Sequence, residues 1–323
     1  MAPPYAPSRS SSLWRAHLRI ARFDHWVKNV FVIPGFVFAL AIDRHRVETL
    51  NWFVPLLGML AVGLVASSNY VLNEILDAPF DRLHPLKRNR PAAAGEINLP
   101  WAWVEWLFLF LCGALLGTAL SRPLGVCLAA LWVMGIAYNA PPLRLKDIAF
   151  VDVLAESANS PIRFMAGWYM TGTTTIPITS LLVSYWMAGA YLMTIKRYAE
   201  SRDVRSRDLL VQYRKCFRYA TERNLLVSIV FYGSLSMLFF GAFMGRYRLE
   251  MALAFPPVAM VMASYMALAF KADSAAQRPE GLWCEPWLLA AVALAVAAIG
   301  VLLFADLPWL HEVFTPTTAP VGR

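Results

Sequence analysis

Residues 73–91 read NEILDAPFDRLHPLKRNRP and close a hydrophobic segment that begins near residue 52. Placing acidic side chains at a membrane boundary costs free energy, so their presence there indicates a functional site. Mg²⁺ takes one or two carboxylates and fills its remaining positions with phosphate oxygens and water. The stretch therefore predicts a site for Mg²⁺ and a phosphorylated substrate. Its polar residues at four-residue spacing are Asn73, Asp77 and Asp81. The basic residues that follow at once are Lys87, Arg88 and Arg90.

The composition is that of an integral membrane protein. The 323 residues are 59% hydrophobic and only 15% charged, with a mean hydropathy of +0.50. A soluble domain of this length would carry about 25% charged residues. The four cysteines form no CxxC pair, so neither a disulfide framework nor a zinc site is indicated. Residues 1–13 are polar and rich in Pro and Ser, which predicts a disordered N-terminus without a secretory signal peptide.

Nine segments are apolar and long enough, or nearly so, to cross a bilayer, which requires about 20 residues. The first is the weakest because Pro34 and Gly35 interrupt it, and the residues before it resemble an interfacial helix. We expect an all-α bundle of nine transmembrane helices, forming one domain over 14–310 with a tail over 311–323. The segments are 28–42, 52–75, 102–120, 123–141, 148–171, 176–195, 224–244, 250–270 and 286–305.

Charge predicts the orientation of these segments. With the N-terminus inside, most of the 29 Lys and Arg residues fall on the cytoplasmic side, which favours an N-in, C-out topology in the cytoplasmic (bacterial inner) membrane. The formal charge of +8 is then a topology signal, and nucleic-acid binding is a poor interpretation. The substantial loops, 76–100, 139–147 and 196–223, all face the cytoplasm in this topology. Any chemistry is expected on that side.

The helix that carries the acidic residues is expected to end near Asp77. Four-residue steps place Asn73, Asp77 and Asp81 on one helical face, but Pro79 removes a hydrogen bond and favours a kink. Asp81 would then lie in the loop. The structural alternative is that the acids only cap a helix end against the basic residues that follow. Three oxygen ligands in register favour a metal–phosphate site.

A second polar cluster spans 138–167 and places charges inside an apolar segment. Arg144 and Lys146 lie in a loop. Asp152, Glu156 and Arg163 follow within the span, and an Arg at membrane depth faces the bundle interior or a partner. A structural Glu156–Arg163 ion pair is one interpretation. Neighbouring polar residues favour a polar cavity instead.

Two further clusters flank apolar segments. Where the sixth segment ends, TIKRYAESRDVRSR at 194–207 supplies a candidate mouth of the site, although a positive-inside flank explains some of these charges. The cations at 213–224 are interpreted as such a flank only. RFDHWVKN at 22–29 is either an interfacial anchor or a contact for a lipid phosphate. The candidate residues of these two clusters are Lys196, Arg197, Tyr198, Glu200, Arg22, Lys28 and Asn29.

These motifs together resemble the UbiA superfamily of intramembrane prenyltransferases. The similarity is strongest to its decaprenyl-phosphate phosphoribosyltransferase branch. The matches are RxxxWVKN at 22–29, NxxxDxxxDxxHPxKxxRPxAAG at 73–95, LK followed by DV at 145–153, RxxAG at 163–167 and KRYAE at 196–200. They cover most of the chain. Aromatic prenyltransferases of the superfamily carry a second DxxxD motif near the end of span six, where this chain reads KRYAESRD.

The resemblance implies that a polyprenyl (decaprenyl) phosphate attacks phosphoribosyl pyrophosphate at the membrane and releases diphosphate. Mg²⁺ would be held by Asn73, Asp77 and Asp81. The product would feed arabinofuranose donors for a cell-wall glycan or a secreted signal, and the sequence leaves homo-oligomerisation open. Lys87 and Arg90 would hold diphosphate, Lys146, Lys196 and Arg197 the ribose phosphate, and Arg22 with Lys28 the lipid phosphate. The remaining predicted substrate-binding residues are Asn29, Tyr138, Arg163, Tyr198 and Glu200.

Two other functions compete with this interpretation. A UbiA-type aromatic prenyltransferase would transfer the prenyl chain from its diphosphate, and it predicts a second acidic motif that the sequence lacks. A small-molecule transporter predicts inverted repeats and helices broken at the midplane. No internal repeat is visible, and the charged clusters gather on one side.

Overall fold

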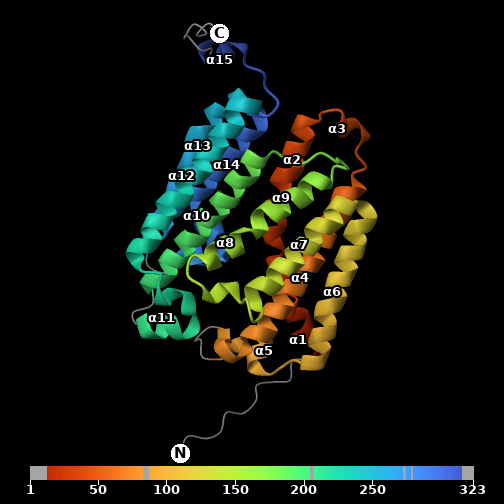
Figure 1. Ribbon diagram of the computed structural model, residues 1–323, viewed down its shortest axis with the longest axis vertical. Coiled ribbons are helices and arrows are strands. Elements are labelled where there is room, and N and C mark those ends of the chain that lie inside the picture. Colours follow the sequence, from red (N-terminus) through yellow and green to blue (C-terminus); the bar gives the residue numbers. More distant parts are fainter. Residues whose placement is uncertain (1–12, 83–86, 204–206, 272–273, 278, 315–323) are drawn as a thin grey trace, which may run out of the picture. The chain divides into compact units, whose positions relative to one another are not determined.

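The computed structural model describes residues 13–82, 87–203, 207–271, 274–277 and 279–314, and every regular element in these ranges is a helix (Figure 1). The chain divides into two compact units. Unit 1 comprises Met1–Ile176 and Ser206–Ala220, and unit 2 comprises Pro177–Arg205 and Thr221–Arg323. Most of the predicted disordered N-terminus and of the C-terminal tail, residues 1–12 and 315–323, lies outside the described residues.

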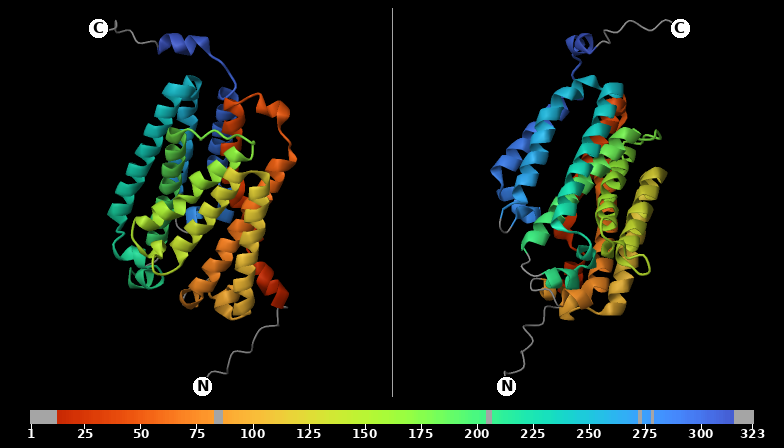
Figure 2. Two further views of the ribbon diagram at one scale, coloured as in Figure 1. Left: turned by 45° about the vertical axis from the view of Figure 1, so that its right-hand side comes forward. Right: turned by 60° about the vertical axis from the view of Figure 1, so that its left-hand side comes forward.

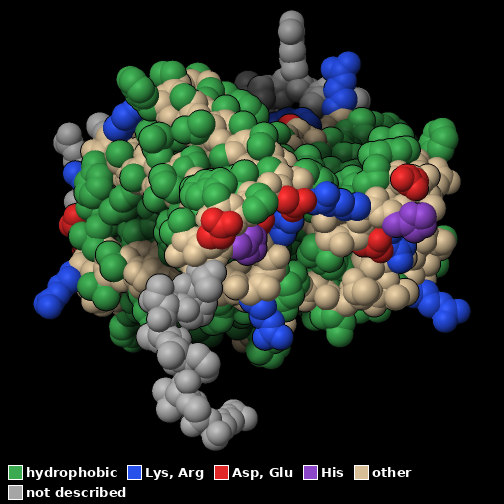
Figure 3. Space-filling view, turned by 90° about the horizontal axis from the view of Figure 1, so that it is seen from above, with side chains coloured by type: hydrophobic (Ala, Val, Ile, Leu, Met, Phe, Trp, Pro, Cys, Tyr) green, Lys and Arg blue, Asp and Glu red, His purple; other side chains and the backbone are tan. Residues whose placement is uncertain are grey.

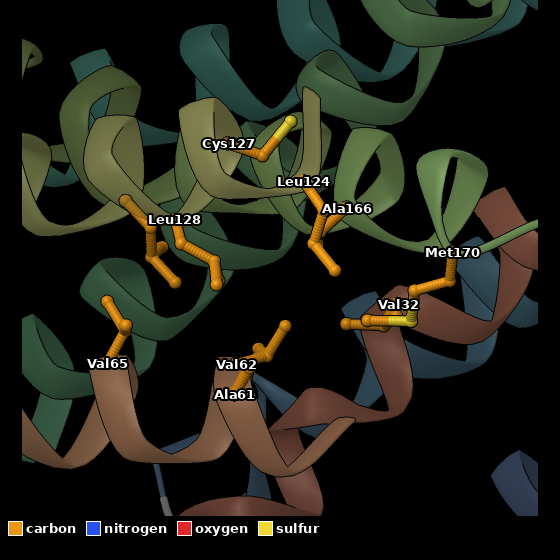
Figure 4. Close-up of a cluster of buried hydrophobic side chains, with 10 residues drawn as sticks. Val32, Ala61, Val62, Val65, Leu124, Cys127, Leu128, Ala166 and Met170 are labelled. Atoms are coloured by element: carbon orange, nitrogen blue, oxygen red, sulfur yellow. The ribbon is translucent and has the colours of Figure 1, made fainter. Parts of the chain in front are cut away.

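Unit 1 is built around α4, Phe53–Asp81. This helix packs against α6, Leu99–Leu120, and α7, Arg122–Asn139 (Figures 1 and 2). Aliphatic side chains of α4, α7 and the following helices interdigitate in a dry core (Figure 4). This core fixes the axis of α4, and so fixes where its polar end lies. The buried members of the cluster are Val32, Ala61, Val62, Val65, Leu124, Cys127, Leu128, Leu131, Ala166 and Met170.

Two glycines let α2, Ile33–Ile42, and α9, Asn159–Tyr169, approach each other closely. A Cβ at Gly35 would lie 1.8 Å from the backbone oxygen of Phe164, and one at Gly167 would lie 2.0 Å from the backbone oxygen of Val32. Small residues at such contacts allow close backbone packing between membrane helices. The glycine that weakens the first predicted span in the sequence therefore has a packing role.

The first span begins differently from the prediction. After α1, Leu13–Ile20, the chain turns at Arg22 in a left-handed conformation (φ 49°) and enters a 3₁₀ helix, η1, Phe23–Val32. The α-helical part, α2, starts only at Ile33, which places Pro34 in the first turn, where its missing N–H costs nothing.

The predicted fifth span, 148–171, consists of two helices, α8, Val151–Ser157, and α9. Pro161 cannot donate a backbone hydrogen bond to the preceding turn. Polar side chains at the junction bond to backbone carbonyls instead: Ser157 Oγ donates to Leu154 O at 3.1 Å, and Asn159 Nδ2 donates to Glu156 O at 3.1 Å. The break is thus stabilised locally.

Unit 2 contains α10, Thr179–Asp203, packed along α12, Glu222–Tyr247. Ser184 and Ser236 join the two helices by reciprocal bonds, each hydroxyl donating to the other residue's carbonyl, at 2.9 and 3.1 Å. The other longer helices of this unit are α13, Phe255–Leu268, and α14, Pro286–Leu302. Its last described element is α15, Pro308–Val313.

The remaining elements are short connectors. Those of unit 1 are α3, Arg46–Thr49; η2, Lys87–Asn89; α5, Pro91–Ala94; η3, Leu145–Asp147; α11, Arg207–Tyr213; and η4, Lys215–Arg218. Those of unit 2 are η5, Leu249–Ala254; η6, Ala275–Gln277; and η7, Pro279–Cys284.

Five helical stretches in the described part of the chain are long and apolar enough to cross a membrane, and the apolar α14 is shorter. Hydrophobic side chains cover much of the face drawn in Figure 3. Each of the nine predicted segments is largely helical, but the count of nine spans and the N-in, C-out topology stay predictions. The five stretches are Leu13–Ile42, Phe53–Asp81, Leu99–Leu120, Glu222–Tyr247 and Leu249–Leu268.

Candidate functional site

The polar end of α4 carries the predicted metal ligands, and α4 extends further than predicted. The helix continues through Pro79 and ends at Asp81, so Asp81 belongs to the helix and not to the loop. Pro79 lacks the N–H that would bond to the preceding turn, but the turn is closed by Arg82 N, which donates to Ala78 O at 3.2 Å. The expectation that the helix ends near Asp77 was wrong. As a result, one rigid element carries Asn73, Asp77 and Asp81.

Asp77 is the centre of a hydrogen-bonded cluster. Its Oδ1 accepts from Lys146 Nζ at 2.5 Å and from Arg144 Nη2 at 3.0 Å. Its Oδ2 accepts from Asn73 Nδ2 at 3.0 Å. Asn139, at the end of α7, accepts through Oδ1 from Asn73 Nδ2 at 2.6 Å and from Lys146 Nζ at 2.9 Å. Asp77 is thus contacted by its own helix and by the loop after α7, and Asn139 on α7 joins the same network through Asn73 and Lys146.

The loop after α7 supplies both cations of the cluster. Lys146 is 7% exposed, and its burial is the main reason that the pKa of its ammonium is lowered to about 8. The nearby Arg144 and Arg214 lower this pKa further, and Asp77 acts in the opposite direction by raising it. Arg144 has a left-handed backbone (φ 34°) that few non-glycine residues adopt. Its guanidinium lies 4.8 Å from the Phe80 ring centroid and also donates to the Asn139 carbonyl at 3.2 Å. The strained backbone turns Arg144 towards α4.

A separate pocket of about 370 Å³ opens beside Asp81. Arg90 Nη1 pairs with Asp81 Oδ2 at 2.7 Å, and Arg90 also lines the pocket together with Arg22. Glu74 lines it too: it is 3% exposed, and its Oε2 has no hydrogen-bond partner among the described residues. Cations surround this carboxylate, so the pocket suits an anion. The complete lining is Arg19, Arg22, Asp24, Glu74, Asn89, Arg90 and Pro91.

The predicted lipid-phosphate residues gather around Tyr70 on α4. The Arg22 guanidinium lies 5.6 Å and the Lys28 ammonium 5.8 Å from the centroid of the Tyr70 ring. Both distances are within the range of a cation–π contact. Asn29 is buried next to them in the sequence. Arg22 therefore links this aromatic platform to the anion pocket.

The other predicted residues of unit 1 lie on α7, η2 and α9. Tyr138 on α7 donates its hydroxyl to Glu156 Oε2 at 3.0 Å. Arg163 is half-buried on α9, and Lys87 is half-buried in η2. His84, which belongs to the motif at 73–95, lies outside the described residues.

The KRYAE motif lies on α10, which belongs to unit 2. Arg197 is 2% exposed, and its Nη1 lies 3.4 Å from Glu200 Oε2, one turn along the same helix. Tyr198 donates its hydroxyl to Glu222 Oε1 at 3.1 Å and so joins α10 to α12. Lys196 is half-buried on the same helix.

The oxygen donors on α4 suit Mg²⁺ in number and type. No group of three or more His, Cys, Asp or Glu is placed to hold a metal ion in the ranges that the structure describes. Asn73, Asp77 and Asp81 form a smaller set of two carboxylates and one amide, which matches an ion that keeps water and phosphate oxygens in its shell. Because Nδ2 of Asn73 is committed to Asp77 and Asn139, its Oδ1 remains the acceptor. The donor set therefore fits the ion.

Sequence reasoning missed several residues of these clusters. Arg144 stands two residues before Lys146 and Asn139 directly follows Tyr138, so both adjoin predicted residues. A buried amide at the end of an apolar segment was the signal for Asn139. Arg19 lies outside the motifs quoted above, and Asp24 and Asn89 lie inside RFDHWVKN and NEILDAPFDRLHPLKRNRP without having been assigned a role.

Helices of this length and apolarity, with acidic and basic side chains gathered at the end of one of them, define a multi-pass membrane protein with a candidate site for anionic substrates. The chain belongs to the UbiA prenyltransferase family, whose model matches residues 31–284. This confirms the family expected from the motifs.

The matched part of the chain spans about a third to three fifths of the length of the curated relatives it resembles. It is 30% identical over 192 residues to the uncharacterized protein y4nM of Sinorhizobium fredii, covering 58% of this chain and 34% of that protein. It is 31% identical over 189 residues to the decaprenyl-phosphate phosphoribosyltransferase of Mycobacterium tuberculosis, covering 57% of this chain and 59% of that protein.

A solved structure of a UbiA homolog from Archaeoglobus fulgidus, bound to GPP and Mg²⁺, superimposes with a TM-score of 0.66. The match covers 88% of this chain and 100% of that chain at 16% identity. At this identity the similarity establishes a shared fold.

Proposed function

We propose that this protein is a transferase that moves 5-phosphoribose from phosphoribosyl pyrophosphate to a polyprenyl phosphate at the cytoplasmic face of a bacterial inner membrane. A phosphate oxygen of the lipid forms a bond to the anomeric carbon of the ribose. The bond from that carbon to the diphosphate oxygen breaks, and diphosphate leaves with the electron pair. The phosphorylated pentose of the product would supply arabinofuranose donors, for a cell-wall glycan or a secreted signal.

The observation that carries this proposal is the convergence of Lys146 and Arg144 on Asp77, with Arg90 on Asp81 nearby. Such alternation of fixed carboxylates and cations suits a substrate that brings both a diphosphate and a metal ion. The matches to curated phosphoribosyltransferases at about 30% identity support the same substrate class. The Mg²⁺ structure of a family member supports a divalent ion.

Each residue has a role that follows from its chemistry. Asn73, Asp77 and Asp81 would hold Mg²⁺, which supplies charge neutralisation at the leaving diphosphate. Lys146 and Arg90, with Lys87, would bind phosphate oxygens, for which ammonium and guanidinium donors are well suited. No general base is needed, because a phosphate monoester is already an anion at neutral pH, so positioning and charge stabilisation would carry the step.

The lipid phosphate is assigned to the pocket that Arg22 and Arg90 line. Arg22 and Lys28 are held over Tyr70, and this arrangement would place two cations beside the entering headgroup. In unit 2, Lys196 and Arg197 are proposed to hold the 5-phosphate, with Tyr198 and Glu200 fixing their helix; Asn29, Tyr138 and Arg163 complete the proposed binding set. A substrate with a long apolar chain would explain why a soluble sugar phosphate is used by a membrane protein.

The alternative is transfer of a prenyl group to an aromatic acceptor, as the family name suggests. It requires a second acidic motif, and residues 196–203 read KRYAESRD at the corresponding place. A transporter is a weaker alternative, because the family match is to transferases.

The test is transfer of radiolabel from ribose-labelled phosphoribosyl pyrophosphate into butanol-extractable lipid. Purified protein is incubated with decaprenyl phosphate, with Mg²⁺ or with EDTA. Label in lipid that disappears with EDTA is the expected result. Prenylation of an aromatic acid by a polyprenyl diphosphate, without transfer of the pentose, would replace this proposal by the alternative.

A further inference from the structure

The segment Arg207–Arg218, formed by α11 and η4, belongs to unit 1, although the helices before and after it in the chain belong to unit 2. The sequence interprets the cations of this region as a positive-inside flank. A flank of that kind requires only exposed charges. Arg214 and Lys215 of this segment instead contact polar residues of unit 1.

Arg214 is the first of these contacts. Its Nη2 donates to the Tyr138 hydroxyl at 2.9 Å, and the same hydroxyl donates to Glu156 Oε2 at 3.0 Å. Since a phenol has a single hydrogen to donate, these two bonds fix the direction of the hydroxyl. Arg214 Nη2 also lies 3.8 Å from Oδ2 of Asp152, a carboxylate that is 2% exposed in the interior of unit 1.

A second contact joins the segment to the cation loop. Lys215 Nζ lies 3.4 Å from Asp147 Oδ2, and Arg144 Nε lies 3.2 Å from the same oxygen. Arg144 in turn donates to Asp77. The segment is thereby connected, through Lys215 and Asp147, to the loop that holds the predicted metal ligand Asp77.

The neighbouring Arg218 shows what a flanking cation looks like. It is the last residue of the 3₁₀ helix η4, and its side chain is exposed. Its guanidinium lies 5.9 Å from the ring centroid of the adjacent, exposed Tyr219. Arg214 is only 19% exposed in its side chain. Two arginines four residues apart therefore differ in exposure: Arg218 is exposed, whereas the less exposed Arg214 contacts Tyr138 and Asp152.

We propose that Arg214 is a positioning residue of the sugar-phosphate site. It holds the Tyr138 hydroxyl in place and offsets the negative charge of Asp152. Through these two residues it shapes the side of the site that Lys146 occupies. This inference rests on the proposed function, and it names the phosphorylated pentose as the substrate whose recognition depends on the Arg207–Arg218 segment. The lipid substrate is not expected to depend on it.

The test compares Arg214→Gln, Arg214→Lys and the matched control Arg218→Gln in the full chain. Binding of phosphoribosyl pyrophosphate with Mg²⁺ is measured by calorimetry, and KM is measured for both substrates. Arg214→Gln is expected to raise Kd and KM for phosphoribosyl pyrophosphate about tenfold, the equivalent of one charged hydrogen bond. KM for decaprenyl phosphate stays unchanged, Arg214→Lys restores part of the affinity, and Arg218→Gln matches the wild type.

Amide hydrogen exchange of residues 207–218 provides a readout independent of turnover. Phosphoribosyl pyrophosphate is expected to slow exchange there in the wild type and in Arg218→Gln, but not in Arg214→Gln. If the wild type binds phosphoribosyl pyrophosphate and Arg214→Gln binds it equally well, the inference is overturned and the proposed function stands.

Two other outcomes also decide the question. If Arg214→Gln weakens both substrates alike and lowers the unfolding temperature, Arg214 only fastens the segment to unit 1, and the inference fails. If the wild type binds no phosphoribosyl pyrophosphate, the proposed function fails first and the inference fails with it.

Discussion

The charged cluster on α4 and the charged motif on α10 are built in different ways. Asp77 is contacted by Lys146 and Arg144, which are 69 and 67 residues away in the chain. On α10, Arg197 lies near Glu200, three residues away on the same helix. Both places contain buried cations and carboxylates. The contacts of Asp77 join segments distant in the chain, whereas the contact between Arg197 and Glu200 lies within one helix.

The α4 cluster is organised around the carboxylate of Asp77, whereas the Arg197–Glu200 pair follows from the spacing of the two residues along α10. A pair at i,i+3 forms on any helix that carries the two residues, and it neutralises charge locally. A carboxylate held by residues 67 and 69 positions away in the chain requires the fold to be formed. Such a site is pre-organised for a ligand that can replace or join those contacts. We therefore expect substitutions at the α4 cluster to affect transfer most.

The largest effect is expected for Asp77→Asn. This change keeps the side-chain size and removes the charge that would hold the metal ion. Label transfer should fall by about 100-fold to 1,000-fold, the range found when one group that stabilises developing charge is lost. The assay is the transfer of ribose label into lipid. Asp306→Asn is the matched control, because Asp306 is an exposed partner of Arg248 in unit 2, and it should keep wild-type activity.

A smaller loss is expected for Lys146→Met. The ammonium bridges Asp77 and Asn139, and Arg144 remains as a second donor to Asp77 when Lys146 is removed. We expect kcat/KM to fall about 10-fold to 100-fold, as for the loss of a charged hydrogen bond. Lys271→Met, at an exposed pair with Glu285, is the control. Equal activity of the two variants would remove Lys146 from the site.

The Asp81–Arg90 pair tests whether the cluster extends to the anion pocket. A double-mutant cycle with Asp81→Asn and Arg90→Gln should give a coupling of about 1–3 kcal/mol in unfolding free energy, because the pair is mostly buried. The more exposed Asp43–Arg46 pair, of similar length, should couple by less than about 1 kcal/mol. Equal couplings would mean that burial adds nothing at Asp81.

The smallest effect on transfer is expected for Glu200→Gln. The amide can still accept a hydrogen bond from Arg197, but it leaves a buried guanidinium without that negative charge. The unfolding temperature should fall, while kcat/KM changes by less than about threefold. A loss of activity as large as that of Asp77→Asn, at unchanged unfolding temperature, would show that the α10 motif contributes to transfer as strongly as the α4 cluster.

The sequence was sufficient for the family, the helical class and the face of α4, because these depend on local spacing and on motifs. It was misleading at Pro79, since a proline near a helix end costs one hydrogen bond without ending the helix. It was also misleading at 148–171, where the chain forms two helices near Pro161 and polar side chains bond to backbone carbonyls at the junction.

The residues that were missed share one property: their role depends on backbone geometry or on distant partners. Arg144 reaches Asp77 because its backbone adopts a left-handed conformation. An arginine in the sequence does not predict such a conformation, which glycine adopts routinely. Arg214 was assigned to a flank because positive charge near a membrane has an adequate general explanation. Its contact with Tyr138 spans 76 residues and is visible only in the folded chain.

The division of the chain has a consequence for biosynthesis. The polypeptide leaves unit 1 after Ile176, returns to it for Ser206–Ala220, and then leaves again. When the ribosome has synthesised every helix from α1 to α9, it has therefore not yet synthesised Arg214 and Lys215, the residues that contact Tyr138 and Asp147. α10 must be synthesised before they emerge. The amino-terminal unit is thus completed late, so a truncated chain ending before residue 206 would lack one side of its own polar cluster.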